Sequence, residues 1–121
     1  MPLAFVTGAS GFVGANLVRV LLQRGWRVRA LVRGAAPSLD GLAVDLVRGD
    51  LFAPTLAEAM RGCDALFHLA ATYSLWKRDR DRMLHANVAG TRTVLAAALE
   101  AGIPRTVHTS SVAAIGVRAD G

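Results

Sequence analysis

The chain has 121 residues, which is enough for one domain with a buried core and no more. Hydrophobic residues make up 53% of it and charged residues 19%, which excludes a disordered chain, and no apolar run approaches the ~18 residues of a membrane span. The net charge is +5, but the arginines are scattered and the densest charged cluster, residues 77–82, alternates with aspartates, so we expect no nucleic-acid partner.

Short apolar runs alternate with segments of helical periodicity along the whole chain. The predicted strands cover residues 2–7, 27–32, 44–47, 65–70 and 105–109. The predicted helices cover residues 13–24, 54–61 and 79–101. This alternation predicts an α/β fold, a Rossmann-type doubly wound parallel sheet with helices on both faces. Right-handed crossovers predict the strand order 3-2-1-4-5.

A glycine-rich loop, TGASGFVG at residues 7–14, lies between the first predicted strand and the first predicted helix. Gly8 permits a tight turn, Gly11 lets the backbone approach a pyrophosphate, and Gly14 lets helix and strand pack closely. The free N–H groups at the start of the helix attract an anion. The loop is no Walker motif, because no Gly-Lys-Ser/Thr follows. It therefore predicts a dinucleotide-binding site.

Four further segments follow in order: GDL at 49–51, FHLAA at 67–71, NVAGT at 87–91 and TSS at 109–111. Together with the T-G-x-x-G-x-x-G start, they resemble the extended branch of the short-chain dehydrogenase/reductase family. Within that branch, the chain is most similar to dihydroflavonol-reductase-like proteins and hopanoid-associated sugar epimerases. The resemblance implies a cofactor site made of Gly8, Ser10, Gly11, Phe12, Val13, Gly14, Arg33, Asp50, Leu51, Leu69, Ala70, Ala71, Thr109 and Ser110. For Asp50, a plain turn residue is the alternative.

The end of the second predicted strand bears on which nicotinamide cofactor is bound. An NAD-selective site has an acidic residue there, which binds the ribose hydroxyls. This strand ends in Leu31-Val32-Arg33, with no Asp or Glu near. The resemblance implies that the planar, charged guanidinium of Arg33 binds the 2′-phosphate, with Arg29 adding to the positive field. We therefore expect NADP rather than NAD; a solvent-facing arginine is the alternative for Arg33.

The sequence YSLWK sets Tyr73 and Lys77 four residues apart, the spacing of a catalytic pair in nicotinamide-dependent enzymes. In the family that pair follows the serine motif of the fifth strand, whereas Tyr73 and Lys77 precede it, so we interpret them as non-catalytic. Ser111 matches the serine that hydrogen-bonds the reacting oxygen. The family's tyrosine and lysine would lie beyond residue 121. We therefore expect residues 1–121 to be one NAD(P)-binding domain, the N-terminal part of a longer enzyme, with the sheet incomplete and the substrate-binding part absent.

These features predict an NADP-dependent oxidoreductase that transfers hydride between nicotinamide and a small-molecule carbonyl or hydroxyl. Two activities fit the resemblance, a dihydroflavonol-4-reductase-like carbonyl reductase and a nucleotide-sugar epimerase. A non-catalytic NADP-binding sensor of the same fold is the alternative. The resemblance also implies a homodimer formed through the helix at 79–101.

The remaining polar residues predict little chemistry. His68, His85 and His108 share no ligand spacing, so we expect no metal site. The first residues, MPLAFVTGAS, have no basic segment before their apolar run and do not read as a secretory signal. The single cysteine, Cys63, excludes an internal disulfide. We expect a cytoplasmic protein.

Overall fold

The computed structural model describes residues 1–111 of the chain. Five parallel strands form one sheet in the order β3-β2-β1-β4-β5, which confirms the predicted strand order and the Rossmann-type α/β fold. The strands are β1 Leu3–Thr7, β2 Arg27–Val32, β3 Asp45–Arg48, β4 Ala65–His68 and β5 Thr106–His108.

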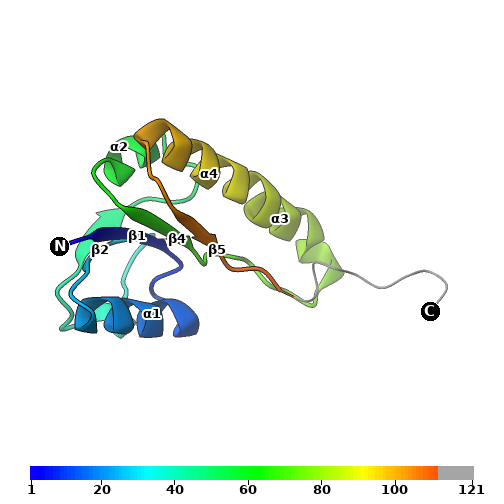
Figure 1. The fold of residues 1–121 in the computed structure, drawn as a ribbon. Helices are drawn as coiled ribbons and strands as arrows, with labels where there is room; N and C mark the ends of the chain where they lie inside the picture. Colours follow the sequence, from blue (N-terminus) through cyan, green and yellow to red (C-terminus); the bar gives the residue numbers. More distant parts are fainter. Residues whose placement is uncertain (112–121) are drawn as a thin grey trace.

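Helices cover both faces of this sheet (Figure 1). Helix α1, Phe12–Gln23, packs on one face, and α2, Leu56–Met60, and α4, Gly90–Ala101, pack on the other. All five residues of β1 are buried, because alternate side chains point into the two cores. This two-sided burial explains why the strand is a continuous apolar run rather than an alternating one.

The predicted helix at 79–101 is interrupted in the structure. A 3₁₀ turn at Lys77–Asp79 leads into α3, Arg80–Leu84, and a π-helical segment, His85–Ala89, separates α3 from α4. Within the π segment the Asn87 carbonyl accepts a hydrogen bond from the Thr91 hydroxyl (2.6 Å). Such π segments inside α-helices often lie at functional sites.

Other predicted elements are shorter than expected; the strand predicted at 105–109, for example, is confined to Thr106–His108. The strand predicted at 65–70 ends at His68. The Leu69 amide makes the last backbone bond to β1, to the Thr7 carbonyl (3.2 Å), and the Ala70 amide donates to the Thr7 side-chain hydroxyl (3.2 Å). The helix predicted at 54–61 is confined to Leu56–Met60, with Thr55 as its N-cap and Pro54 outside it. The structure adds a short 3₁₀ turn at Pro37–Leu39 that the sequence pattern did not predict.

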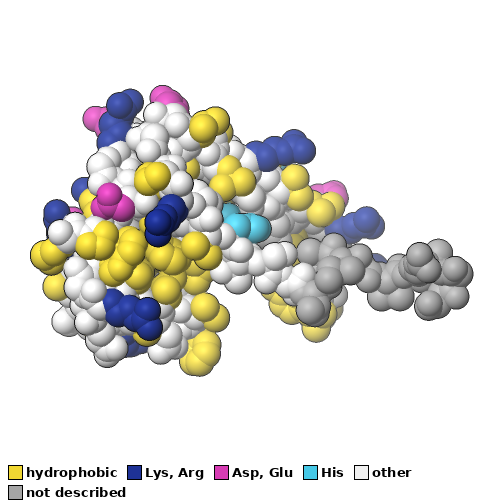
Figure 2. Space-filling view, viewed as in Figure 1, with side chains coloured by type: hydrophobic (Ala, Val, Ile, Leu, Met, Phe, Trp, Pro, Cys, Tyr) yellow, Lys and Arg dark blue, Asp and Glu magenta, His cyan; other side chains and the backbone are white. Residues whose placement is uncertain are grey.

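On the face that Figure 2 shows, the arginine and lysine side chains are spread out rather than gathered into one patch. No helix in residues 1–111 is long and apolar enough to span a bilayer. Among the same residues, no group of three His, Cys, Asp or Glu side chains is placed to hold a metal ion.

Candidate functional site

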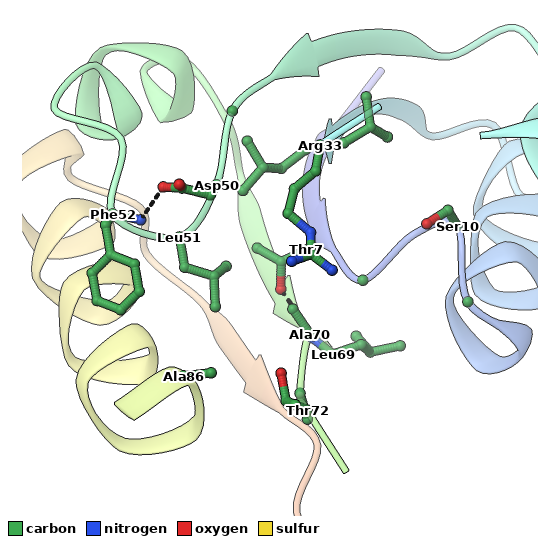
Figure 3. A pocket seen from close by; sticks show the side chains of 16 residues that line it. Thr7, Ser10, Arg33, Asp50, Leu51, Phe52, Leu69, Ala70, Thr72 and Ala86 are labelled. Carbon is green, nitrogen blue, oxygen red and sulfur yellow. Dashed lines mark hydrogen bonds between the residues drawn. The ribbon is translucent and has the colours of Figure 1, made fainter. Parts of the chain in front are cut away.

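A cavity of about 430 Å³ opens beyond the carboxyl ends of β1, β2, β3 and β4. In a doubly wound sheet, ligands bind at this edge, where the strand order reverses. The volume lies within the ~300–1,000 Å³ of small-molecule sites. Figure 3 shows the side chains that surround the cavity. The lining residues are Thr7, Gly8, Ser10, Gly11, Leu31, Val32, Arg33, Gly49, Asp50, Leu51, Phe52, Leu69, Ala70, Ala71, Thr72 and Ala86.

The glycine loop has the close backbone contacts that its sequence predicts. Gly8 has a φ of +70°, and a Cβ atom there would lie 2.7 Å from the backbone nitrogen of Ala70. A Cβ atom on Gly14 would overlap the Gly8 carbonyl oxygen and lie 2.7 Å from its carbonyl carbon. Gly11 is different, because the nearest atom to a Cβ there is the Gly8 oxygen at 3.4 Å. Gly8 and Gly14 therefore shape the loop, and Gly11 leaves space on its outer side.

The first turn of α1 points its amide groups toward the loop side of the cavity. Gly11 is the N-cap residue and has no side chain with which to cap these amides. The Ser10 carbonyl accepts a hydrogen bond from the Ser38 hydroxyl (2.8 Å), which ties the loop to the Pro37–Leu39 turn. An anion held at such a helix start gains from the free N–H groups and the helix dipole.

The opposite side of the cavity is formed by Asp50, Leu51 and Phe52, after β3. One Asp50 carboxylate oxygen accepts a hydrogen bond from the Phe52 amide (2.8 Å), so Asp50 stabilises the turn and leaves its second oxygen available (Figure 3). The Thr93 hydroxyl donates to the Leu51 carbonyl (2.6 Å). Leu51 also fills the space over Gly90, where a Cβ atom would lie 2.8 Å from its Cδ1. Two positions of α4 thus hold this segment in place.

Arg33 follows the last residue of β2 and lines the cavity. Figure 3 shows its guanidinium reaching between the side that carries Asp50 and the loop that carries Ser10. The Arg29 guanidinium donates to the carbonyls of Ala59 (2.7 Å) and Arg61 (3.3 Å) at the end of α2, and its contribution to the positive field stays a prediction. Arg29 is absent from the described lining of the cavity.

The third side of the cavity is the segment from Leu69 to Thr72, after β4. The amides of Leu69 and Ala70 each donate to the buried Thr7 hydroxyl (3.2 Å). His68, directly before this segment, is 1% exposed. Burial, together with the smaller effect of the neighbouring His108 imidazole, lowers the pKa of His68 to about 4. His68 is therefore neutral at physiological pH.

Nine predicted cofactor residues line the cavity: Gly8, Ser10, Gly11, Arg33, Asp50, Leu51, Leu69, Ala70 and Ala71. Phe12, Val13 and Gly14 are outside this lining; Phe12 and Val13 are exposed on the first turn of α1 and Gly14 is buried beneath the loop.

Thr109, Ser110 and Ser111, which follow β5, are exposed and also outside the described lining. The Thr109 amide donates to the His68 carbonyl (3.1 Å), which sets this segment beside the wall that begins at Leu69. Their roles at the cofactor and substrate stay predictions.

Tyr73 and Lys77 do not form a pair on one helix. Tyr73 lies in an irregular segment and is 80% exposed, and Lys77 begins the 3₁₀ turn. Between them the Ser74 hydroxyl donates to the Asp79 carboxylate (2.6 Å), which holds the segment in a bend. This placement agrees with the interpretation that the YSLWK spacing is incidental.

Seven lining residues were not predicted: Thr7, Leu31, Val32, Gly49, Phe52, Thr72 and Ala86. Thr7 and Gly49 belong to the TGASGFVG and GDL motifs, and Thr72 directly follows FHLAA, so the sequence could have indicated these three positions. Ala86 lies next to Asn87 on the π segment, and the Asn87 side-chain amide makes two hydrogen bonds of 2.8 Å to the backbone of Thr72. Ala86 lines the cavity because of this tertiary contact, and no feature of the sequence around Ala86 indicates its position.

The arrangement of the lining would suit an extended molecule with a central diphosphate. The space outside Gly11 lies at the start of α1, a position that suits the diphosphate. The two flanks differ, with apolar side chains and the charged Arg33 on one and the backbone wall of Leu69 to Ala71 on the other. Such a molecule is a dinucleotide.

Comparison with known proteins agrees with this geometry. Residues 4–120 match the model of the NAD dependent epimerase/dehydratase family. A Synechocystis sp. protein, provisionally named a dihydroflavonol 4-reductase, is 58% identical over 119 residues, covering 97% of this chain and 35% of the relative. A Stigmatella aurantiaca ketoreductase of a farnesyl-dihydroquinoline oxide is 50% identical over 121 residues, covering 97% of this chain and 35% of the relative.

A solved structure shares both fold and sequence with the chain. It is a short-chain dehydrogenase/reductase superfamily protein from Agrobacterium tumefaciens with bound NAD, 38% identical, with a TM-score of 0.78 over 90% of this chain and 32% of that one. The chain thus spans about a third of the length of the proteins it matches. The match over residues 4–120 confirms the resemblance, and the chain belongs to the NAD dependent epimerase/dehydratase family, the extended short-chain dehydrogenases/reductases.

Proposed function

We propose that residues 1–121 form the cofactor-binding part of an NADP-dependent carbonyl reductase. The observation that carries this proposal is the position of Arg33, at the end of β2 and inside the cavity. An NAD-selective relative would need a carboxylate at that position to bind the ribose hydroxyls. Arg33 instead offers a planar, permanently charged fork that suits a phosphate.

Different residues of the chain would bind different parts of the cofactor. The first turn of α1 would hold the diphosphate, Arg33 the 2′-phosphate, and Asp50 and Leu51 the adenine. The wall from Leu69 to Ala71 would lie along the nicotinamide half. The bound nicotinamide supplies or accepts the hydride, and Ser111 would donate a hydrogen bond to the reacting oxygen.

Reductase activity is supported by the named activities of the Synechocystis and Stigmatella relatives, which act on carbonyl groups. A second candidate is a nucleotide-sugar epimerase, favoured by the name of the matched family. The two differ in their use of the cofactor. A reductase consumes one NADPH for each product, whereas an epimerase returns the hydride to its substrate and consumes none.

The full-length protein tests this proposal directly. NADPH oxidation should be followed with apolar ketones, such as flavanonols and alkyl or aryl ketones, and with UDP-sugars. We expect NADPH consumption with at least one ketone and none with the sugars. Interconversion of UDP-sugars without net NADPH loss would favour the epimerase, and tight NADPH binding without turnover of either class would favour a sensor.

We further propose a homodimer through the helix at 79–101. Four apolar side chains on α3, the π segment and α4 are exposed, spaced four, seven and four residues apart: Leu84, Val88, Leu95 and Leu99. This spacing sets them along one side of the helix, and such a stripe suits packing against the same helix of a second copy.

A further inference from the structure

One side of the cavity is held by a continuous chain of hydrogen bonds centred on His68. The Thr7 hydroxyl lies 2.6 Å from His68 Nδ1, and the Thr91 hydroxyl lies 3.1 Å from His68 Nε2. From Thr91 the chain continues to the carbonyl of Asn87, whose side-chain amide holds the backbone of Thr72 at both N–H and C=O. The chain therefore links β1, β4, α4 and the π segment.

The hydrogen-bond partners fix the tautomer of His68. The Thr7 hydroxyl oxygen accepts from the amides of Leu69 and Ala70, so its single proton is donated to Nδ1. The Thr91 hydroxyl donates its proton to the Asn87 carbonyl, so it can only accept from Nε2. His68 is therefore neutral, with its proton on Nε2. A protonated Nδ1 would leave the Thr7 hydroxyl proton without an acceptor among the described residues.

The hydrogen-bond network around His68 includes residues that line the cavity. In this respect His68 differs from a histidine whose hydrogen bonds only satisfy its polar atoms within the core. Thr7, Leu69, Ala70 and Thr72 all line the cavity, although His68 itself does not. The glycine loop and the segment that begins at Leu69 are also in close contact, because a Cβ atom on Gly8 would lie 2.7 Å from the Ala70 nitrogen. A shift of the Thr7 hydroxyl would move the wall relative to the glycine loop.

We propose that His68 is a positioning residue for the cofactor: its neutral imidazole holds Thr7 and Thr91 at a fixed separation and thereby sets the distance between the glycine loop and the wall that begins at Leu69. This inference rests on the proposed cofactor site. According to this inference, His68 affects the affinity for the cofactor although its side chain does not line the cavity. Outer partners of ligand-binding groups commonly act in this way.

Three substitutions separate the two hydrogen bonds of the ring. His68→Asn keeps an acceptor near Nδ1 and loses the bond to Thr91, His68→Gln keeps a donor that reaches Thr91 and loses the bond to Thr7, and His68→Leu loses both. Leu66→Ala is the control, because Leu66 is fully buried in the core on the same strand and is outside the described lining of the cavity.

The readout is the Kd for NADPH of the full-length protein, from the fluorescence of the bound nicotinamide. We expect His68→Leu to raise Kd about tenfold or more, His68→Asn and His68→Gln to raise it less, and Leu66→Ala to lower Tm with Kd unchanged. An unchanged Kd in folded His68→Leu, or an equal rise in Leu66→Ala, would overturn the inference alone. No NADPH or NADH binding by the wild type would overturn the proposed function as well.

The tautomer can be tested in the wild-type protein. The inference can therefore be disproved even if the His68 variants fail to fold. Imidazole ¹⁵N spectra of the wild-type protein distinguish a protonated from an unprotonated ring nitrogen. We expect an unprotonated Nδ1 and a protonated Nε2 for His68 at neutral pH. A protonated Nδ1, in either a neutral or a charged ring, would overturn the assignment and the positioning role that rests on it.

Discussion

A side chain on Gly14 would collide with the backbone of Gly8, because its Cβ atom would overlap the Gly8 carbonyl oxygen. The contact joins the first turn of α1 to the turn that leaves β1. The Gly8 carbonyl also accepts a hydrogen bond from the Gly11 amide (3.2 Å), so the close approach of Gly14 to Gly8 helps to set the shape of the loop.

Gly14→Ala should lower the free energy of unfolding by about 3 kcal/mol, although alanine is the better helix former by ~1 kcal/mol. Gly11→Ala is the matched variant in the same loop, where the nearest atom to the new Cβ lies at 3.4 Å. It should change stability by no more than about 0.5 kcal/mol and weaken cofactor binding, because the new methyl group occupies the side that faces the diphosphate. Urea unfolding measures the first effect; equal losses of stability in the two variants would contradict the account.

Tyr73→Phe should leave turnover within a few-fold of the wild type in the full-length enzyme. The ring is 80% exposed in an irregular segment, and Lys77 lies on a separate 3₁₀ turn. Loss of a general acid or base costs ~10² to 10⁴ in rate. A fall in kcat of that size would show that Tyr73 transfers the proton after all.

The stability of the protein should fall as the pH drops from about 6.5 to about 4. Burial and His108 hold the pKa of His68 near 4 in the folded state, against ~6.5 when unfolded, so the unfolded chain binds more protons in this window. The stabilisation is complete above the unfolded pKa, and its loss on acidification amounts to about 3 kcal/mol. Urea titrations across this range should show a shallower pH slope for His68→Gln; parallel slopes would disprove the assignment.

Leu95→Glu combined with Leu99→Glu should convert the full-length protein from dimer to monomer. Both leucines are exposed on α4 and belong to the proposed interface, where buried carboxylates would repel. Leu46→Glu, on β3 and 49% exposed, is the control for replacing an exposed leucine by a carboxylate outside the proposed interface. Sedimentation equilibrium distinguishes the outcomes, and a monomeric wild type would refute the interface.

The fold was largely predictable because its signals are local. Strands buried on both faces, such as β1, are continuous apolar runs, and Gly102 ends α4 where the prediction ended the helix. The π segment was not predictable. It depends on the side chain of Asn87, which binds Thr72 fifteen residues earlier in the chain, and no periodicity in the helix records that contact.

The same division applies to the cavity. Residues in motifs, such as Gly8, Arg33 and Ala70, were predicted because their chemistry is carried by their position after a strand. Phe52 was missed because its place depends on stacking against His85, with ring centroids 4.7 Å apart. The contacts of Arg29 with the carbonyls at the end of α2 have no signal in the sequence, because they join segments some thirty residues apart.

The most direct test of the central claim is a calorimetric titration of NADPH and NADH into the full-length wild-type protein and its Arg33→Asp variant. Arg27→Ala is the control, since Arg27 lies on the same strand and pairs with Asp45 outside the cavity. We expect one NADPH per chain, bound more tightly than NADH by about tenfold or more, corresponding to ~1.4 kcal/mol or more for the phosphate contact. Arg33→Asp should abolish this preference and Arg27→Ala should keep it. Equal binding of the two cofactors by the wild type, or an unchanged preference in Arg33→Asp, would contradict the assignment of an NADP-dependent enzyme.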